Sequence, residues 1–259
     1  MVSLKDLINS HNKRGTTVED IIKRNGYEQI LENVVIAPCW KSSIFKDCSQ
    51  KIEQFGEKVF NVYGKDFEFS FLEINNMGAS SILECVLPLG LTKCKRIIFI
   101  GSVGSLDENI NIGDLVVPTC SYNGVGACRF LNKNLEDDFE TKTYPNKELT
   151  NQIISVLSKD FKQHKIHQTV NYSVDTMFAQ FLHIQHFIDL GCQTIEMETS
   201  SLFKCGELAN IQTSALLCVS DNTLRNKSLY SGRNEEERKL RREVRNKIIP
   251  QIIINVFKS

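Results

Sequence analysis

The architecture of the chain is best predicted from residues 97–105, which read Ile97-Ile98-Phe99-Ile100-Gly101-Ser102-Val103-Gly104-Ser105. The first four residues of this stretch are wholly apolar, which is typical of a strand buried on both faces of a parallel sheet. The strand runs straight into two glycines, which predict a turn at its carboxyl end. Because glycine has no Cβ atom, the N–H groups of such a turn can face an anion or a water molecule closely. The stretch therefore predicts an α/β fold with a ligand site beside Gly101 and Ser102.

Strand-like and helix-like segments alternate on both sides of this stretch. We expect strands at 34–38, 58–63, 67–72, 97–100, 113–118, 168–173, 192–196 and 213–219, and helices at about 80–91, 147–163, 178–189, 198–210 and 234–257. Residues 121–146 are polar and predict a long excursion that can border a site. The pattern predicts a single α/β domain at 33–259, with a central mixed, largely parallel sheet flanked by helices. Residues 1–32 predict an N-terminal helical extension.

The composition of the 259-residue chain limits the class of protein. Its 31 basic and 31 acidic residues balance, so we expect no general attraction to nucleic acid or to an anionic membrane. The nine cysteines include no C-x-x-C pair, which favours reduced thiols in a cytoplasmic protein. No stretch approaches eighteen uninterrupted apolar residues, so no membrane span is expected.

Two acidic motifs follow predicted strands, Ile195-Glu196-Met197-Glu198 and Val219-Ser220-Asp221. Carboxyl groups bind sugar hydroxyls and move protons. In an open α/β sheet the ligand crevice lies outside the carboxyl ends of the strands, so we expect both motifs to meet there with Met77-Gly78, Gly101-Ser102 and the loop at Cys39-Trp40-Lys41. The simpler alternatives are that Glu198 favours a helix dipole, Asp221 caps the next segment and Met77 packs.

The order of these elements, with Gly101 to Leu106, Asn111 to Val117 and the two acidic motifs, resembles the nucleoside phosphorylase superfamily over residues 33–257. That family includes purine nucleoside phosphorylases, uridine phosphorylases and methylthioadenosine nucleosidases. The resemblance implies cleavage of the N-glycosidic bond of a nucleoside, through a transition state with positive charge on the ribose. It also implies a homo-oligomer, a small nucleoside as the partner molecule, and phosphate as a co-substrate with no other cofactor.

The resemblance gives roles to particular residues. Glu198 matches the carboxyl group that grips the ribose hydroxyls, and Asp221 matches the acid that protonates a purine at its imidazole nitrogen, which requires partial burial. An aspartate at 221 favours a purine over uridine. The other substrate contacts that the resemblance implies are Met77, Gly101, Ser102, Met177, Phe178, Glu196, Met197 and Ser220. Met177 and Phe178 match a segment that lines the base pocket, with ordinary core packing as their alternative.

The acceptor site departs from the family's pattern. Phe99 and Ser43 stand where phosphorolytic members have arginines, whose planar fork binds phosphate. Ser102 and Lys41 remain as candidates to hold a phosphate. We expect phosphorolysis to free base and ribose 1-phosphate. The sequence leaves open a nucleosidase that uses water, although no acidic residue occurs from Val34 to Lys46 to activate it, and a nucleoside-binding protein without catalysis.

Two other patterns have plainer explanations. The basic run Arg238-Lys239-Leu240-Arg241-Arg242 could bind nucleic acid, but acidic neighbours at i,i+4 spacing favour a solvated helix face that pairs with itself. The pairs His164-x-x-His167 and His183-x-x-His186 could bind a metal, but neither has cysteines or carboxylates at ligand spacing. We therefore expect surface histidines and no metal.

Overall fold

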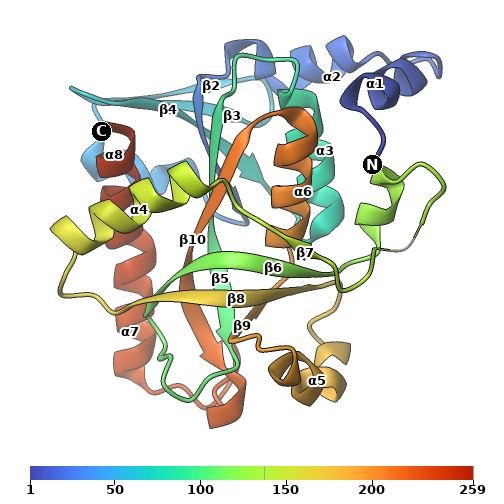
Figure 1. Cartoon of the computed structure of the whole chain (residues 1–259). Helices are drawn as coiled ribbons and strands as arrows, with labels where there is room; N and C mark the ends of the chain where they lie inside the picture. Colours follow the sequence, from blue (N-terminus) through green and yellow to red (C-terminus); the bar gives the residue numbers. More distant parts are fainter. Residues whose placement is uncertain (137, 259) are drawn as a thin grey trace.

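The apolar runs of the sequence form one ten-stranded mixed sheet in the computed structural model, which describes residues 1–136 and 138–258 (Figure 1). The strands are β1 (Asn33–Pro38), β2 (Lys51–Phe55), β3 (Val59–Tyr63), β4 (Glu68–Ile74), β5 (Arg96–Ser105), β6 (Leu115–Gly124), β7 (Lys142–Thr143), β8 (Ile166–Val174), β9 (Thr194–Glu196) and β10 (Gln212–Asn222). The helices are α1 (Leu4–Asn12), α2 (Val18–Asn25), α3 (Ala79–Leu89), α4 (Lys147–Asp160), α5 (Ile184–Asp189), α6 (Thr199–Ala209), α7 (Glu235–Glu243) and α8 (Ile249–Lys258). The prediction of an α/β domain with a mixed sheet flanked by helices is confirmed.

Part of the sheet closes on itself. The strand order is β10-β6-β8-β9-β5-β1-β4-β3-β2, and β5 also pairs directly with β10. The strands from β10 to β5 therefore form a ring, from which β1, β4, β3 and β2 extend. Strands β4, β1, β5 and β10 pair in parallel, as do β6, β8 and β9, whereas the two groups meet in antiparallel pairs.

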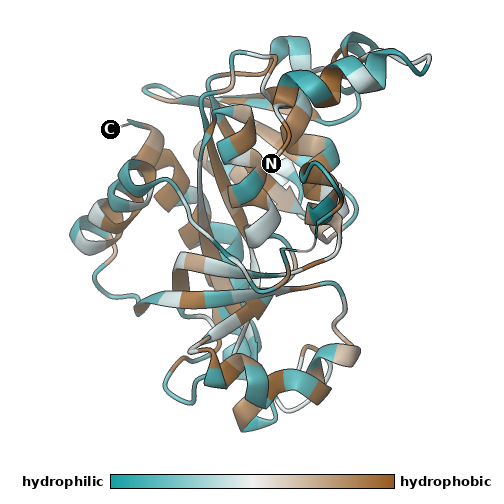
Figure 2. Cartoon of the chain, turned by 45° about the vertical axis from the view of Figure 1, so that its right-hand side comes forward, coloured by the Kyte–Doolittle hydropathy of each residue, from teal (hydrophilic) through white to brown (hydrophobic). Residues whose placement is uncertain are grey.

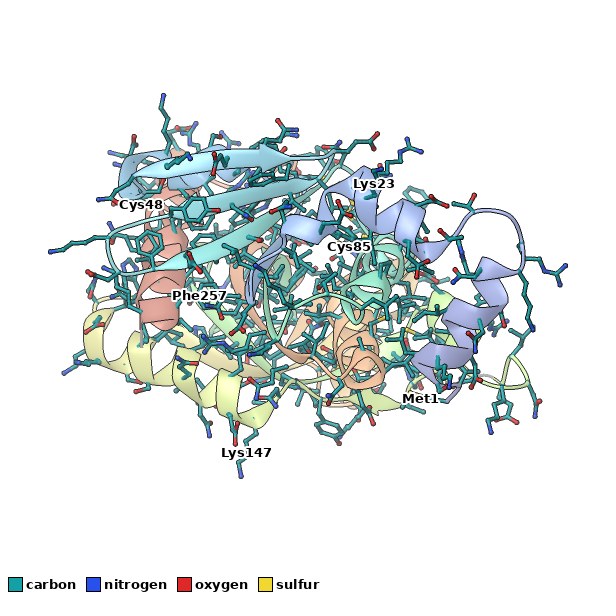
Figure 3. The ribbon with its side chains drawn as sticks, turned by 90° about the horizontal axis from the view of Figure 1, so that it is seen from above. Met1, Lys23, Cys48, Cys85, Lys147 and Phe257 are labelled. Carbon is teal, nitrogen blue, oxygen red and sulfur yellow. The ribbon has the colours of Figure 1, made fainter. Side chains whose placement is uncertain are left out.

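Successive side chains of β5 face two different hydrophobic layers, as expected for a strand buried on both faces. Phe99 and Val103 pack in the layer of α3 and α6, while Ile98 and Ile100 pack in the layer of α4 and α8. Figure 2 shows hydrophobic residues along the central strands and on the helices that cover them. In the view from above, Cys85 of α3 and Phe257 of α8 mark the two layers (Figure 3).

The first 32 residues form α1, α2 and a 3-10 helix at Tyr27–Gln29. Capping boxes begin both α-helices, with Ser3 and Asp6 at α1 and Thr17 and Asp20 at α2. Leu4 of α1 packs against the same core as α3 and α6. The extension therefore lies against the domain, and its division from residues 33–259 stays a prediction, with Ser259 outside the described residues.

The glycine turn predicted after Ile100 is wrong. Residues 101–105 continue β5, and they pair with β10 from Gly101 opposite Leu217 to Ser105 opposite Asn222. The glycines serve close packing instead. A Cβ atom at Gly101 would lie 2.9 Å from the Phe99 ring, and one at Gly104 would lie 2.8 Å from Oδ2 of Asp221.

Three further expectations need correction. Strand β2 was not predicted, and residues 121–136 and 138–146 contain the end of β6, a 3-10 helix at Ala127–Leu131 and β7. The predicted single C-terminal helix is α7 and α8 joined by a π-helical segment, Val244–Ile248. Within the described ranges, the structure contains no helix long and apolar enough to cross a membrane.

Candidate active site

The last residues of β5 are flanked by the two acidic motifs. Gly104 pairs with Asp221 of β10 on one edge and with Ile195 of β9 on the other (Figure 1). Because neighbouring strands lie about 4.8 Å apart, the backbones of Asp221 and Ile195 lie about 10 Å apart across Gly104. Strand β9 is antiparallel to β5, so the chain after Ile195 heads back along β5 toward Ser102. The structure thus places Glu196 to Glu198 and Asp221 on opposite flanks of the same short segment.

Glu198 is a buried carboxyl group at the start of α6, with 6% of the residue exposed. Its Oε1 accepts a hydrogen bond of 2.6 Å from the N–H of Gly78, the N-cap of α3. Gly78 has φ +95°, a conformation that favours glycine. Burial, followed by the negative charge of Glu196, raises the pKa of Glu198 to about 8. The predicted meeting of the loop after β4 with the first acidic motif is therefore present, with Met77 half exposed beside it.

Glu196 holds the connection between β9 and α6. Its Oε2 accepts hydrogen bonds of 2.7 Å from the backbone N–H groups of Glu198 and Thr199. Its Oε1 accepts from the side chains of Asn171, Ser173 and Thr199 at 2.6–2.8 Å. Both oxygens are thus engaged inside the protein, which makes Glu196 a positioning residue for Glu198 in this structure.

Asp221 lies next to a bulge of β10, since the register with β5 shifts between Val219 and Asp221. The Ser220 hydroxyl donates a hydrogen bond of 2.5 Å to Oδ1 of Asp221. Burial raises the pKa of Asp221, while the Ser220 hydrogen bond and the charge of Arg233 oppose that shift. A Cβ atom at position 104 would displace Oδ2 of this side chain from its present position.

Three arginines lie near this segment, and two of them, Arg241 and Arg245, were missed from the sequence. Arg241 of α7 donates from Nη2 to Oγ of Ser102 at 3.0 Å, and Arg233 donates from Nη1 to the carbonyl of Ser220 at 3.1 Å. The guanidinium of Arg245 lies 4.6 Å from the centre of the Trp40 ring. One signal was available, because Arg241 precedes the buried Val244 by three residues, and that spacing puts both on one helix face.

The remaining predicted residues either pair with groups other than Glu198 and Asp221 or are partly exposed. Nζ of Lys41 forms an ion pair with Glu73 at 2.9 Å and contacts Oδ1 of Asn75 at 3.2 Å. Met177 and Phe178 are 41% and 93% exposed, so neither packs in a core. Met197 is partly buried against the hydrophobic cluster of β8, β9 and α5.

Comparison with known proteins agrees with this fold and arrangement. Residues 55–252 match the model of the Phosphorylase superfamily. The chain is 25% identical over 207 residues to a DeoD-type purine nucleoside phosphorylase from Exiguobacterium sp. (strain ATCC BAA-1283 / AT1b), covering 76% of this chain and 83% of that protein.

Solved structures share the fold at lower identity. A uridine phosphorylase from Vibrio fischeri ES114 superimposes with a TM-score of 0.75 at 19% identity, covering 88% of this chain and 92% of that chain. A 5'-methylthioadenosine/S-adenosyl homocysteine nucleosidase from Campylobacter jejuni superimposes with a TM-score of 0.67 at 14% identity, covering 88% and 99%. With three quarters of its length matched by the family model, this chain belongs to the phosphorylase superfamily, as its two acidic motifs led us to expect.

Proposed function

We propose that this enzyme cleaves the N-glycosidic bond of a purine nucleoside by phosphorolysis, yielding free base and ribose 1-phosphate. The observation that carries the proposal is the buried carboxyl group of Asp221, held beside Gly104 with its pKa raised. A raised pKa favours the protonated form of the carboxyl group, which can give its proton to a departing purine. The DeoD-type purine nucleoside phosphorylase with 25% identity agrees with this choice of base.

The ribose would lie against Glu198. A carboxyl group with a pKa of about 8 is partly neutral at pH 7, so it can donate to one ribose hydroxyl and accept from another. The Gly78 N–H fixes one of its oxygens. Once ionised, the same group stabilises the positive charge that develops on the ribose as the bond breaks.

The chemical step needs one proton and one nucleophile. A phosphate oxygen forms a bond to C1′ while the C1′–N bond breaks. The electron pair of the C1′–N bond goes to the base. Asp221 gives its proton to the imidazole nitrogen of the purine and regains one when the products leave. The reaction is thereby balanced without a redox cofactor.

Hydrolysis is the second candidate. It is favoured by Phe99, a buried apolar side chain at a position where phosphorolytic relatives were expected to have an arginine. Water would then attack C1′ in place of phosphate, giving free ribose. A binding protein without turnover is the third outcome.

The test is release of free base from inosine and from adenosine, measured in phosphate-free buffer and with added phosphate. We expect the rate to depend on phosphate and ribose 1-phosphate to accumulate. Equal rates without phosphate would make the enzyme a nucleosidase. Nucleoside binding without base release under either condition would contradict the proposed activity.

A further inference from the structure

Three arginines gather beside the end of β5 without a carboxylate in direct contact, although the charges of Asp221 and Glu237 act on Arg233 from farther away. In the described part of the chain, Arg233, Arg241 and Arg245 form no ion pair with a carboxylate, whereas their neighbour Arg242 pairs with Glu235 at 2.9 Å. The Nε atoms of Arg233 and Arg245 are buried and have no hydrogen-bond partner. Burial and the charge of Arg241 lower the pKa of both groups. Like charges held close together in a partly buried position are stabilised when an anion joins them.

Arg241 reaches the strand residue that faces this cluster. Its Nη2 donates to Oγ of Ser102, so the hydroxyl hydrogen of Ser102 remains free to donate to a ligand. Along the other edge of β5, strand β1 pairs with β5 as far as Phe99, and strand β9 pairs with it from Gly104 onward. Residues 100–103 therefore lie between two strand partners, where backbone N–H groups can meet an anion.

Arg245 brings a second cation to the loop after β1. Its guanidinium lies over the ring of Trp40, which is 5% exposed. This is the loop where Ser43 replaces an arginine of the family's pattern. Lys41 in the same loop is already paired with Glu73. The helix therefore supplies a planar cation to a loop that lacks one of its own.

We propose that Arg241 and Arg245 of the C-terminal helix, with Ser102, bind the phosphate that acts as acceptor. This site rests on the proposed function and replaces the cations absent at positions 99 and 43. Ser102 pairs with Cys218 and Gly104 pairs with Asp221, so the phosphate and the acid are two residues, or about 7 Å, apart along β5. A guanidinium fork binds two phosphate oxygens at once, and Ser102 donates to a third.

The first experiment measures binding of inorganic phosphate by isothermal titration calorimetry, without nucleoside. We expect Arg241→Gln to weaken phosphate binding at least about tenfold, and Arg241→Lys to recover part of it, because a buried charge-assisted pair is lost or partly restored. Arg242→Gln is the matched control, since that side chain lies on the outer face and pairs with Glu235. Unchanged binding in Arg241→Gln would overturn the proposal.

The second experiment separates this site from the proposed activity. Base release in Arg241→Gln should show a raised KM for phosphate with a smaller change in the KM for nucleoside. If wild-type protein releases base but binds no phosphate, the phosphate site is wrong and glycosidic cleavage stands. If it binds phosphate through Arg241 but releases no base, the site stands and the activity is wrong.

Should Arg241→Gln fail to fold, as judged by thermal melting, Arg245→Lys provides the same comparison. Nucleoside 5′-monophosphate that binds better than inorganic phosphate would show that the cations serve a phosphorylated nucleoside, which also overturns the proposal.

Discussion

At the scale of single residues, the two carboxyl groups beside β5 have different tasks. Asp221→Asn should lower kcat for purine nucleosides at least about 100-fold while KM changes little, because a proton is needed only as the bond breaks. Steady-state kinetics with inosine measure both constants. A substrate whose leaving group needs no proton, such as a nitrophenyl riboside, should be affected far less. Full activity of the variant on inosine would remove Asp221 from the mechanism.

Glu198 should make the stability of the protein depend on pH. Its pKa is raised from 4.5 to about 8, so the folded state favours the neutral form. The stabilisation from this group is complete below the unfolded pKa and is lost as the pH rises through the folded pKa. We expect the melting temperature of wild-type protein to fall relative to Glu198→Gln between about pH 5 and pH 9. Thermal melts of both proteins in that range measure the difference, and a constant difference would contradict the prediction.

At the scale of elements, the π-helical segment sets the direction in which Arg241 points. A π turn contains one residue more than an α turn, and such segments often occur at functional sites. Inserting one alanine after the exposed Asn246 should rotate α7 by about 100° relative to α8, because an α-helix turns by that angle for each residue. We expect the variant to keep its circular dichroism spectrum but to lose its response to phosphate. Asn246→Ala is the control, and it should behave as wild type.

The elements that a sequence can predict are those with a strong local pattern. β5 and β10 contain the apolar runs 97–100 and 215–219. Asp221 follows the second run, and Glu198 follows the short strand β9, so the neighbourhood of both carboxyl groups could be predicted. β2 could not, because Lys51, Glu53 and Gln54 dominate its five residues. Its pairing with β3 and the packing of Ile52 and Phe55 against the cores appear only in the folded chain.

The glycines of β5 and the arginines of α7 were misread for a related reason. Gly101 and Gly104 are explained by the Phe99 ring and the Asp221 side chain, which are contacts made in the folded chain. The inward direction of Arg241 depends on the rotation of a helix interrupted by a π segment. Both features depend on tertiary contacts, and the spacing of Arg241 and Val244 indicates a shared helix face without indicating what that face contacts.

At the scale of the whole molecule, apolar side chains lie exposed between β8 and α5. Phe178 and Leu182 are 93% and 86% exposed, and Phe181 is 56% exposed. Exposed apolar groups that lie together commonly mark an interface. We expect a homo-oligomer, and light scattering after size exclusion should show a smaller particle for the double variant Phe178→Ser, Leu182→Ser. Tyr230→Ser, which removes another exposed apolar side chain elsewhere, should leave the mass unchanged. A monomeric wild-type protein would contradict this prediction.

The ring of strands from β10 to β5 affects the tendency of the protein to self-associate at high concentration. The ring offers a foreign strand little free backbone beyond residues 100–103 of β5, and the extended part of the sheet ends at β2. Lys51 and Glu53 on that strand form an ion pair at 2.6 Å and keep both charges partly in water. Any strand that docked there would have to strip water from these charges, which guards the protein against fibrillar self-association.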